Sequence, residues 1–311
     1  MGHSHHHHHD ASSSRLGWAF VLNFCFTIIE FIGGWLTNST AIMSDAVHDL
    51  GDSLSIGSAW VLNKLGKKPA THRFSYGFRR LSLYGALINS LVLIIGSAFV
   101  LNEAIPRLFD PVMPHAEGML GLALLGVLVN GFAAYRLSAG QTLNEKVLNW
   151  HLMEDVLGWL AVLIVSVVLM FADIPVLDPL LSVVFTLFIL LNVARNFWST
   201  LTLFAQSVPD EDMAVEIRSQ LLTLPAVADI HHLHFWSLDG EHHVLTAHLV
   251  LHQPLTATEQ AASKADIQQL LAPFNLEHTT IELELPQEIC RDQPATDQST
   301  TRILKQPENN H

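Results

Sequence analysis

The sequence is poor in charged residues, because only 14% of its 311 residues are Asp, Glu, Lys or Arg, whereas an ordinary soluble protein carries about a quarter. Its two cysteines, Cys25 and Cys290, stand far apart, which argues against a disulfide framework and against a cysteine zinc site. Basic residues are also scarce, with 16 Lys and Arg against 29 Asp and Glu, so we expect no nucleic-acid partner. Half of the chain is hydrophobic, and histidine, with 19 copies, outnumbers Lys and Arg together. This balance excludes a wholly soluble or disordered chain.

The hydrophobic residues gather in long runs. A helix needs about 20 residues to cross the bilayer core, and six stretches are long enough. We expect six spans at Leu16–Leu36, Ala41–Leu62, Leu81–Ala104, Met119–Leu137, Val147–Phe171 and Pro179–Leu203.

The composition changes after Gln206. From Ser207 onward the chain carries 16 acidic and 5 basic residues, and helical and alternating patterns follow in the order αββαβ. We expect an all-α membrane domain of six transmembrane helices followed by a small α+β cytoplasmic domain. The expected domains are a His-rich tail at 1–14, the membrane domain at 15–206, the cytoplasmic domain at 207–286 and a polar, disordered tail at 287–311. The expected soluble elements are helices Asp210–Leu224 and Thr256–Leu271 and strands Val227–Ser237, His243–His252 and Thr279–Leu285.

Lys and Arg in short loops predict the orientation, because they favour the cytoplasmic side of a membrane. The loop between the second and third spans holds six of them, Lys64, Lys67, Lys68, Arg73, Arg79 and Arg80. With six spans, both termini then face the cytoplasm. The N-terminus lacks the pattern of a signal peptide. From the short loops and the absence of a transit peptide we expect a multi-pass protein of a bacterial cell inner membrane.

Two His-x-x-x-Asp pairs lie inside the expected spans. His48 and Asp52 are four residues apart on the second span, and His151 and Asp155 have the same spacing on the fifth. Residues four apart share one face of a helix. Two such helices facing each other offer two imidazoles and two carboxylates, a donor set suited to tetrahedral zinc. Two carboxylates neutralise one divalent ion, and protons would relieve their charge after it leaves. The pairs therefore predict metal–proton exchange.

Other interpretations of these residues stay open. The pairs are also compatible with structural groups at helix ends, with a metal sensor or storage protein, or with a magnesium or manganese carrier, although those ions prefer all-oxygen sites. A membrane metalloenzyme would keep an open metal position, and the chain has no His-Glu-x-x-His motif. We therefore expect a transporter and not an enzyme.

Several stretches resemble the cation diffusion facilitators, the zinc-transporter family. They are SDAVHDLGDS at Ser44–Ser53, NWHLMEDVLGW at Asn149–Trp159, HRFSYGFRRLSLYGALIN at His72–Asn89, and, in the soluble part, IHHLHFWSL, LTAHLVL and HTTIELE. The resemblance implies a six-span homodimer that exports zinc, or else cadmium, cobalt or iron, against protons. It places the transport ligands on His48, Asp52, His151 and Asp155. A histidine at position 48 is similar to the zinc-preferring members.

The resemblance also implies a cytoplasmic metal set of His231, His248, His278 and Glu284, with zinc as a possible regulatory ligand. From strand alternation we expect His232 and His234 on one face of their strand and His231 on the other.

For several further residues two interpretations stay open. His72 is a loop ligand or simply solvated, Asp45 is a relay acid or a partner of His48, Glu30 lines a path or joins helices, and the tract His5–His9 is native or an expression tag.

Overall fold

The computed structural model describes residues 8–66, 70–138, 143–290 and 292. The chain divides into two compact units. The first comprises the residues up to 78 together with 84–198, and the second comprises 79–83 together with the chain from 199 onward.

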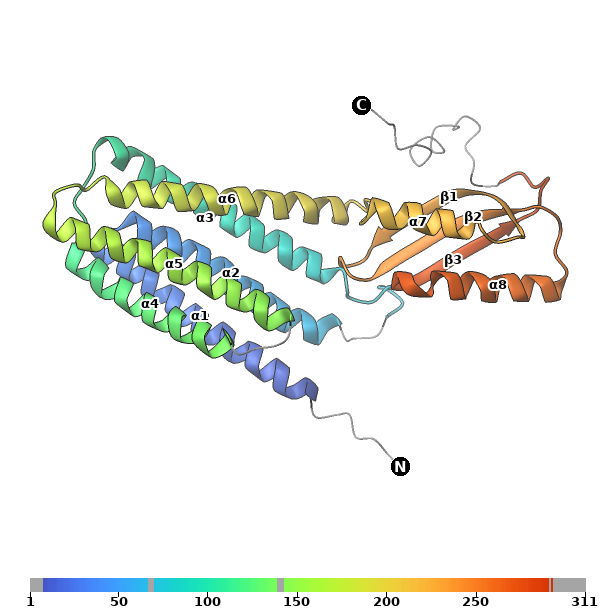
Figure 1. Cartoon of the computed structure of the whole chain (residues 1–311), viewed down its shortest axis with the longest axis horizontal. Coiled ribbons are helices and arrows are strands. Elements are labelled where there is room, and N and C mark those ends of the chain that lie inside the picture. The colour runs from blue at the N-terminus through green and yellow to red at the C-terminus, as the bar shows by residue number, and fades with distance from the viewer. Residues whose placement is uncertain (1–7, 67–69, 139–142, 291, 293–311) are drawn as a thin grey trace. The chain divides into compact units, whose positions relative to one another are not determined.

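Six long helices run through the membrane part, one for each expected span (Figure 1). Among the described residues, five of them contain a stretch long and apolar enough to cross a membrane. The exception is α2, which is 27 residues long but carries Asp45, Asp49 and Asp52 in its first half. These acids lower the mean hydropathy of α2. Its length and its packing among the other helices identify it as the sixth span. The helices are α1 (His8–Thr37), α2 (Thr40–Gly66), α3 (Leu81–Phe109), α4 (Ala116–Ser138), α5 (Leu143–Phe171) and α6 (Leu177–Phe204).

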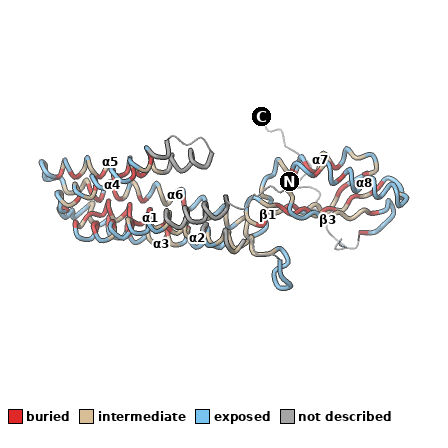
Figure 2. Tube along the Cα trace, turned by 90° about the horizontal axis from the view of Figure 1, so that it is seen from below, coloured by how far each residue is buried: buried red, intermediate tan, exposed pale blue. Residues whose placement is uncertain are grey.

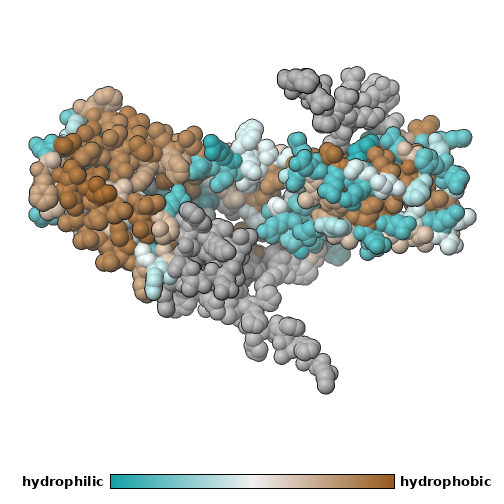
Figure 3. All heavy atoms as spheres, viewed as in Figure 1, coloured by the Kyte–Doolittle hydropathy of each residue, from teal (hydrophilic) through white to brown (hydrophobic). Residues whose placement is uncertain are grey.

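The outward faces of these helices are apolar. Figure 3 shows a hydrophobic surface over the helices and a largely hydrophilic surface over the second unit. Leu22 is 67% exposed, Phe99 65% and Phe132 66%. Soluble monomers rarely expose so large a contiguous apolar area. The first unit is therefore built to face lipid.

The first unit is packed by close helix pairs, with buried residues along their facing sides (Figure 2). Trp159 of α5 is 1% exposed and lies against α4. Gly126 of α4 gives it room, because a side-chain carbon there would overlap the indole ring. A small residue at this position thus sets how closely α4 and α5 approach.

The start of α2 is held by an acid from another helix. After Asn38, whose φ is 55°, Asp178 in the first turn of α6 accepts hydrogen bonds from the Ser39 hydroxyl at 2.5 Å, the Thr40 amide at 2.7 Å and the Thr40 hydroxyl at 2.8 Å. Ser182 donates to the Thr40 carbonyl at 2.9 Å. Amides at a helix N-terminus have no partner within the helix, so this carboxylate satisfies them and fixes the position of α2 beside α6.

The second unit has the expected αββαβ order (Figure 1). The strands form one sheet in the order β1-β2-β3, with β1 and β2 antiparallel and β2 and β3 parallel. On β2, Leu245, Ala247 and Leu249 enter the hydrophobic core, so the alternating Thr246 and His248 belong to the opposite face. The elements are α7 (Glu211–Leu221), β1 (Val227–Ser237), β2 (His243–Leu251), α8 (Ala257–Leu271), the 3-10 turn η1 (Ala272–Phe274) and β3 (Leu276–Glu284).

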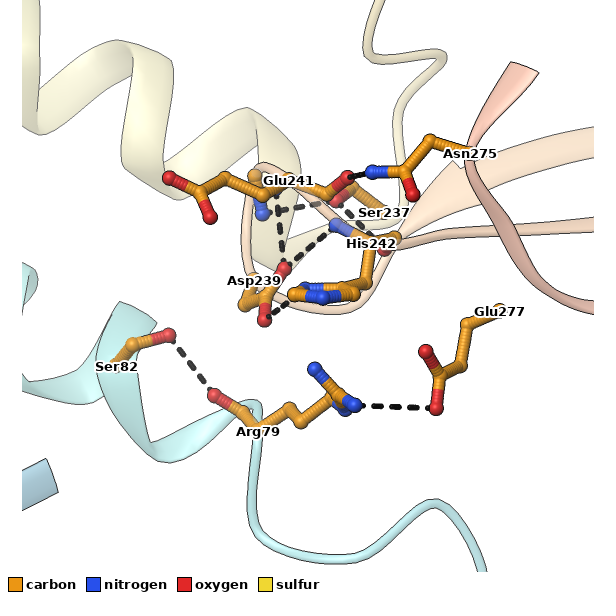
Figure 4. A network of polar contacts seen from close by, with 9 residues as sticks. Arg79, Ser82, Ser237, Asp239, Glu241, His242, Asn275 and Glu277 are labelled. Carbon is orange, nitrogen blue, oxygen red and sulfur yellow. Dashed lines mark hydrogen bonds and ion pairs between the residues drawn. The ribbon is translucent and has the colours of Figure 1, made fainter. Parts of the chain in front are cut away.

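Polar contacts tie the β1–β2 turn to the start of β3 (Figure 4). Asp239 accepts hydrogen bonds from the Glu241 and His242 amides at 3.0 and 2.8 Å. Asn275 donates to the Glu241 carbonyl at 2.9 Å, and Arg79 pairs with Glu277 at 3.2 Å. These contacts close one end of the sheet. The histidines of the expected metal set on β1 and β2 lie toward the other end.

Candidate metal centres

The first group of possible metal ligands comes from α2 and α5. His48 Nε2 lies 3.7 Å from an oxygen of Asp52, one turn along α2, and 3.8 Å from an oxygen of Asp155 on α5. One donor atom from each residue can be chosen so that all lie within 4.8 Å of one another. The i, i+4 spacing brings the α2 pair together, and helix packing adds Asp155. The structure thus joins three of the four intramembrane residues expected from the sequence.

The fourth expected residue is His151. It lies on α5, four residues before Asp155, but its side chain is outside the described residues. Its place in the ligand set remains a prediction.

A cavity of about 410 Å³ reaches this group. It is lined by His48, Asp45 and Asp155, and by apolar side chains of α6 that include Phe185 and Phe188. Charge interactions are stronger beside such apolar walls than in open water. The group therefore combines access for an ion with a setting in which two carboxylates favour a doubly charged partner.

Further acids surround the group. Asp45 is 8% exposed and lines the cavity, whereas Asp49 is 5% exposed and its carboxyl faces that of Glu30 on α1. Asn23 of α1 donates to the Asp49 carbonyl at 3.2 Å. Asp49 is thus turned toward α1 and does not belong to the group of His48, Asp52 and Asp155. This agrees with the helical angle that separates it from His48.

The second group lies on the sheet face opposite the hydrophobic core. Glu284, at the end of β3, contacts His231 Nε2 at 2.9 Å and His248 Nδ1 at 2.7 Å. Cys290 Sγ lies 3.4 Å from His248 Nδ1. Donor atoms of these four residues all lie within 4.8 Å of one another. They provide two nitrogens, one oxygen and one sulfur, a set that suits zinc.

The acid and the thiol of this group influence each other. Burial raises the pKa of Glu284, but hydrogen bonds from Cys290 and His248 and the charge of His231 outweigh it, so the pKa falls below its usual value. Burial raises the pKa of the Cys290 thiol, and the nearby Glu284 carboxylate raises it further. The carboxylate is thus ionised near neutral pH, as a metal ligand must be.

A bulge on β1 corrects the expected facing of its histidines. His231 pairs with His248, and His234 pairs with Thr246. Between these two pairs β1 has two residues where β2 has one. His232 sits in this bulge with a φ of 47°. Because the extra residue shifts the alternation, His231 and His234 share the face of His248. The expectation that His231 lies opposite His234 was wrong.

The structure does not bring His278 to this group. It precedes Glu284 by six residues on β3, which at about 3.3 Å per residue separates their Cα atoms by about 20 Å. One ion cannot span that distance within a chain. His72 is exposed and lies in neither group. From the sequence we did not expect Cys290 to be a zinc ligand, yet it lies in one group with His231, His248 and Glu284. No spacing motif in the sequence indicates it.

Comparison with known proteins covers nearly the whole described chain. Residues 17–204 match the cation efflux transmembrane domain, and residues 209–285 match the cytoplasmic domain of cation efflux proteins. A "Cadmium, cobalt and zinc/H(+)-K(+) antiporter" of Bacillus velezensis is 30% identical, covering 91% of this chain and 92% of the relative. The "Metal cation efflux system protein CzcD" of Cupriavidus metallidurans is 31% identical over 91% and 90%. The "Zinc transporter ZitB" of Pectobacterium atrosepticum is 30% identical over 91% and 89%.

Proposed function

Since this chain belongs to the cation efflux family, we propose that it exports zinc from the cytoplasm in exchange for protons. Members of this family are multi-pass membrane transporters of metal cations, and they are not enzymes. The names of its relatives mention zinc, cadmium and cobalt, and one of them mentions protons. The choice of zinc and the exchange for protons are the proposed part.

The proposal rests on the convergence of His48 and Asp52 from α2 with Asp155 from α5. His151, one turn from Asp155 along α5, completes the proposed ligand set. Two imidazoles and two carboxylates favour zinc over magnesium or manganese, which prefer oxygen donors alone. Cadmium, cobalt and iron remain competing cargoes for the same donors.

Proton exchange follows from the charges of the empty and loaded site. Two carboxylates balance a divalent ion, but after the ion leaves they would stay as close anions beside apolar walls. Protons bound by the acids and imidazoles relieve that repulsion. Metal entry from the cytoplasm then releases protons, and metal exit on the other side takes them up.

Transport in vesicles tests this proposal. The purified full chain is reconstituted with a pH gradient, and zinc flux is followed with a fluorescent indicator. Asp52→Asn and Asp155→Asn should each abolish flux, whereas Glu117→Gln, which changes an exposed acid in the first turn of α4, should leave it intact. If the flux of the wild type does not change with the pH gradient, the proposed exchange for protons is wrong. If flux persists in both Asp variants, the proposed metal site is wrong.

We further propose a homodimer in a bacterial inner membrane with both termini in the cytoplasm. The basic loop between α2 and α3 supports this orientation, and the match to the family's cytoplasmic domain supports the dimer. Within each protomer, His231, His248 and Glu284 would hold a regulatory metal ion that favours one arrangement of the pair. A reporter that works only in the cytoplasm should be active when it is fused after residue 292. Cross-linking should capture two copies of the chain.

A further inference from the structure

The segment after β3 folds back toward the sheet. The Leu285 amide donates to a Glu288 side-chain oxygen at 2.9 Å, and the Glu288 amide donates to the Leu285 carbonyl at 3.0 Å. This pair of contacts makes a local turn. Beyond it, Ile289 is 88% exposed while Cys290 is 7% exposed. An apolar side chain thus points outward and the thiol points inward, toward His248 and Glu284.

The four donors of this group lie close enough together to surround a single ion. Bonds of about 2.0–2.3 Å from zinc to nitrogen, oxygen or sulfur separate neighbouring donors by about 3.3–3.6 Å. The thiol lies 3.4 Å from His248 Nδ1, and Glu284 oxygens lie 2.7 and 2.9 Å from the two imidazoles. Small side-chain shifts would open these hydrogen-bond distances to the coordination distance.

The charges of the group also match one divalent ion. A thiolate and a carboxylate together carry two negative charges, and two neutral imidazoles add none. Glu284 is 3% exposed and Cys290 is 7% exposed, so an ion held here would be shielded from water by protein donors. Closed four-ligand sites of this kind are structural zinc sites, in contrast to open catalytic sites.

We propose that Cys290 is the fourth ligand of a closed site for one thiophilic divalent ion, zinc or cadmium, completed by His231, His248 and Glu284. The inference deepens the cytoplasmic metal set of the proposed function, with a sulfur ligand taking the place expected for His278. On binding, a metal–sulfur bond forms and the thiol proton passes to solvent. The bond ties the segment 285–290 after β3 to β1 and β2.

A thiolate ligand would give this site a spectroscopic signature. The intramembrane group contains only nitrogen and oxygen donors. The chain has two cysteines, and the other, Cys25, lies exposed on α1. A thiolate-to-metal charge-transfer band would therefore come from Cys290, and Cys25→Ser provides a matched control. Histidine-only sites, including the N-terminal tract His5–His9, produce no such band.

The experiment titrates cadmium and cobalt into metal-free full-length protein in detergent and records the ultraviolet and visible absorption. Wild type and Cys25→Ser should both develop a thiolate charge-transfer band whose final amplitude corresponds to one thiolate-bound ion per chain. Cys290→Ser should lose the band and bind that ion at least about tenfold more weakly, the smallest effect expected even for a residue outside the ligand shell. Bound zinc should also protect Cys290 in Cys25→Ser from a maleimide reagent.

Two results would overturn the inference, and neither depends on transport. If metal binds the wild type without a charge-transfer band, Cys290 is not a ligand, although the histidines still can be. A band that persists in Cys290→Ser would assign the sulfur elsewhere. The wild-type spectrum decides even if a variant fails to fold. His248→Ala serves as the third arm: if its thiolate band and the affinity of that ion equal those of wild type, His248 is not a ligand of the cytoplasmic site. The Asp52→Asn and Asp155→Asn variants test the intramembrane site separately, so failure of one proposal is distinguished from failure of the other.

Discussion

The imidazole of His48 on α2 lies 3.8 Å from the carboxylate of Asp155 on α5. This approach joins two His-x-x-x-Asp helices that the sequence keeps about 100 residues apart, and it places a nitrogen donor between two acids. The choice of nitrogen at this position should then govern which ion the site accepts.

His48→Asp should shift the preference from zinc toward harder ions. The change replaces an imidazole with an oxygen donor and adds a negative charge, and manganese and magnesium favour oxygen-rich, acidic sites. Competition between zinc and manganese in vesicle flux measures the shift, with the exposed-acid variant Glu117→Gln as control. Unchanged competition would mean that residue 48 does not contact the ion.

Asp178→Asn should loosen the start of α2. The carboxylate accepts hydrogen bonds from Ser39 and Thr40, and an amide has one accepting oxygen where the carboxylate has two. Leaving buried donors without an acceptor costs about 1–3 kcal/mol. Thermal unfolding in detergent should show a lower Tm, and zinc flux should fall because His48 lies two turns further along α2. Asp173→Asn changes an exposed acid shortly before α6 and should alter neither Tm nor flux. Equal losses of Tm and flux in the two variants would refute the capping role of Asp178.

Gly126→Ala should destabilise the α4–α5 pair. The new methyl group would meet the Trp159 indole, and overpacking of this kind costs about 1–3 kcal/mol. Gly131→Ala on the same helix is the control, since nothing lies within 4 Å of the added carbon. That change should leave Tm unchanged or raise it slightly, because alanine favours a helix over glycine. A similar Tm for both variants would contradict the close packing at Trp159.

The start of α8 should weaken in acid. Hydrogen bonds from Thr256 lower the pKa of Glu259 below its usual value of 4.5. The stabilisation is therefore present above pH 4.5 and is lost as the pH falls through the lowered pKa of the folded state. Amide hydrogen exchange over the first turn of α8, compared with Glu259→Gln at each pH, measures this. The two proteins should converge in acid; a constant difference down to pH 3 would contradict it.

Local features of this protein could be read from its sequence. Six apolar runs became six helices, because a helix is held by hydrogen bonds between residues close in sequence and the bilayer thickness sets the length of the apolar run. The pairing of His48 with Asp52 follows from one helical turn. The αββαβ order was also predicted, and Val227–Ser237 is a strand with the expected bounds, since alternation is a property of the strand itself.

Tertiary structure alone decided the rest. The approach of Asp155 to His48 depends on how α5 packs beside α2, which no local pattern encodes. The bulge at His232 turns His231 toward His248, and only strand pairing reveals it. Cys290 reaches Glu284 because the segment after β3 turns back. In each case, side chains distant in sequence meet through long-range packing, whereas sequence periodicity reports only on which face of its own element a residue lies.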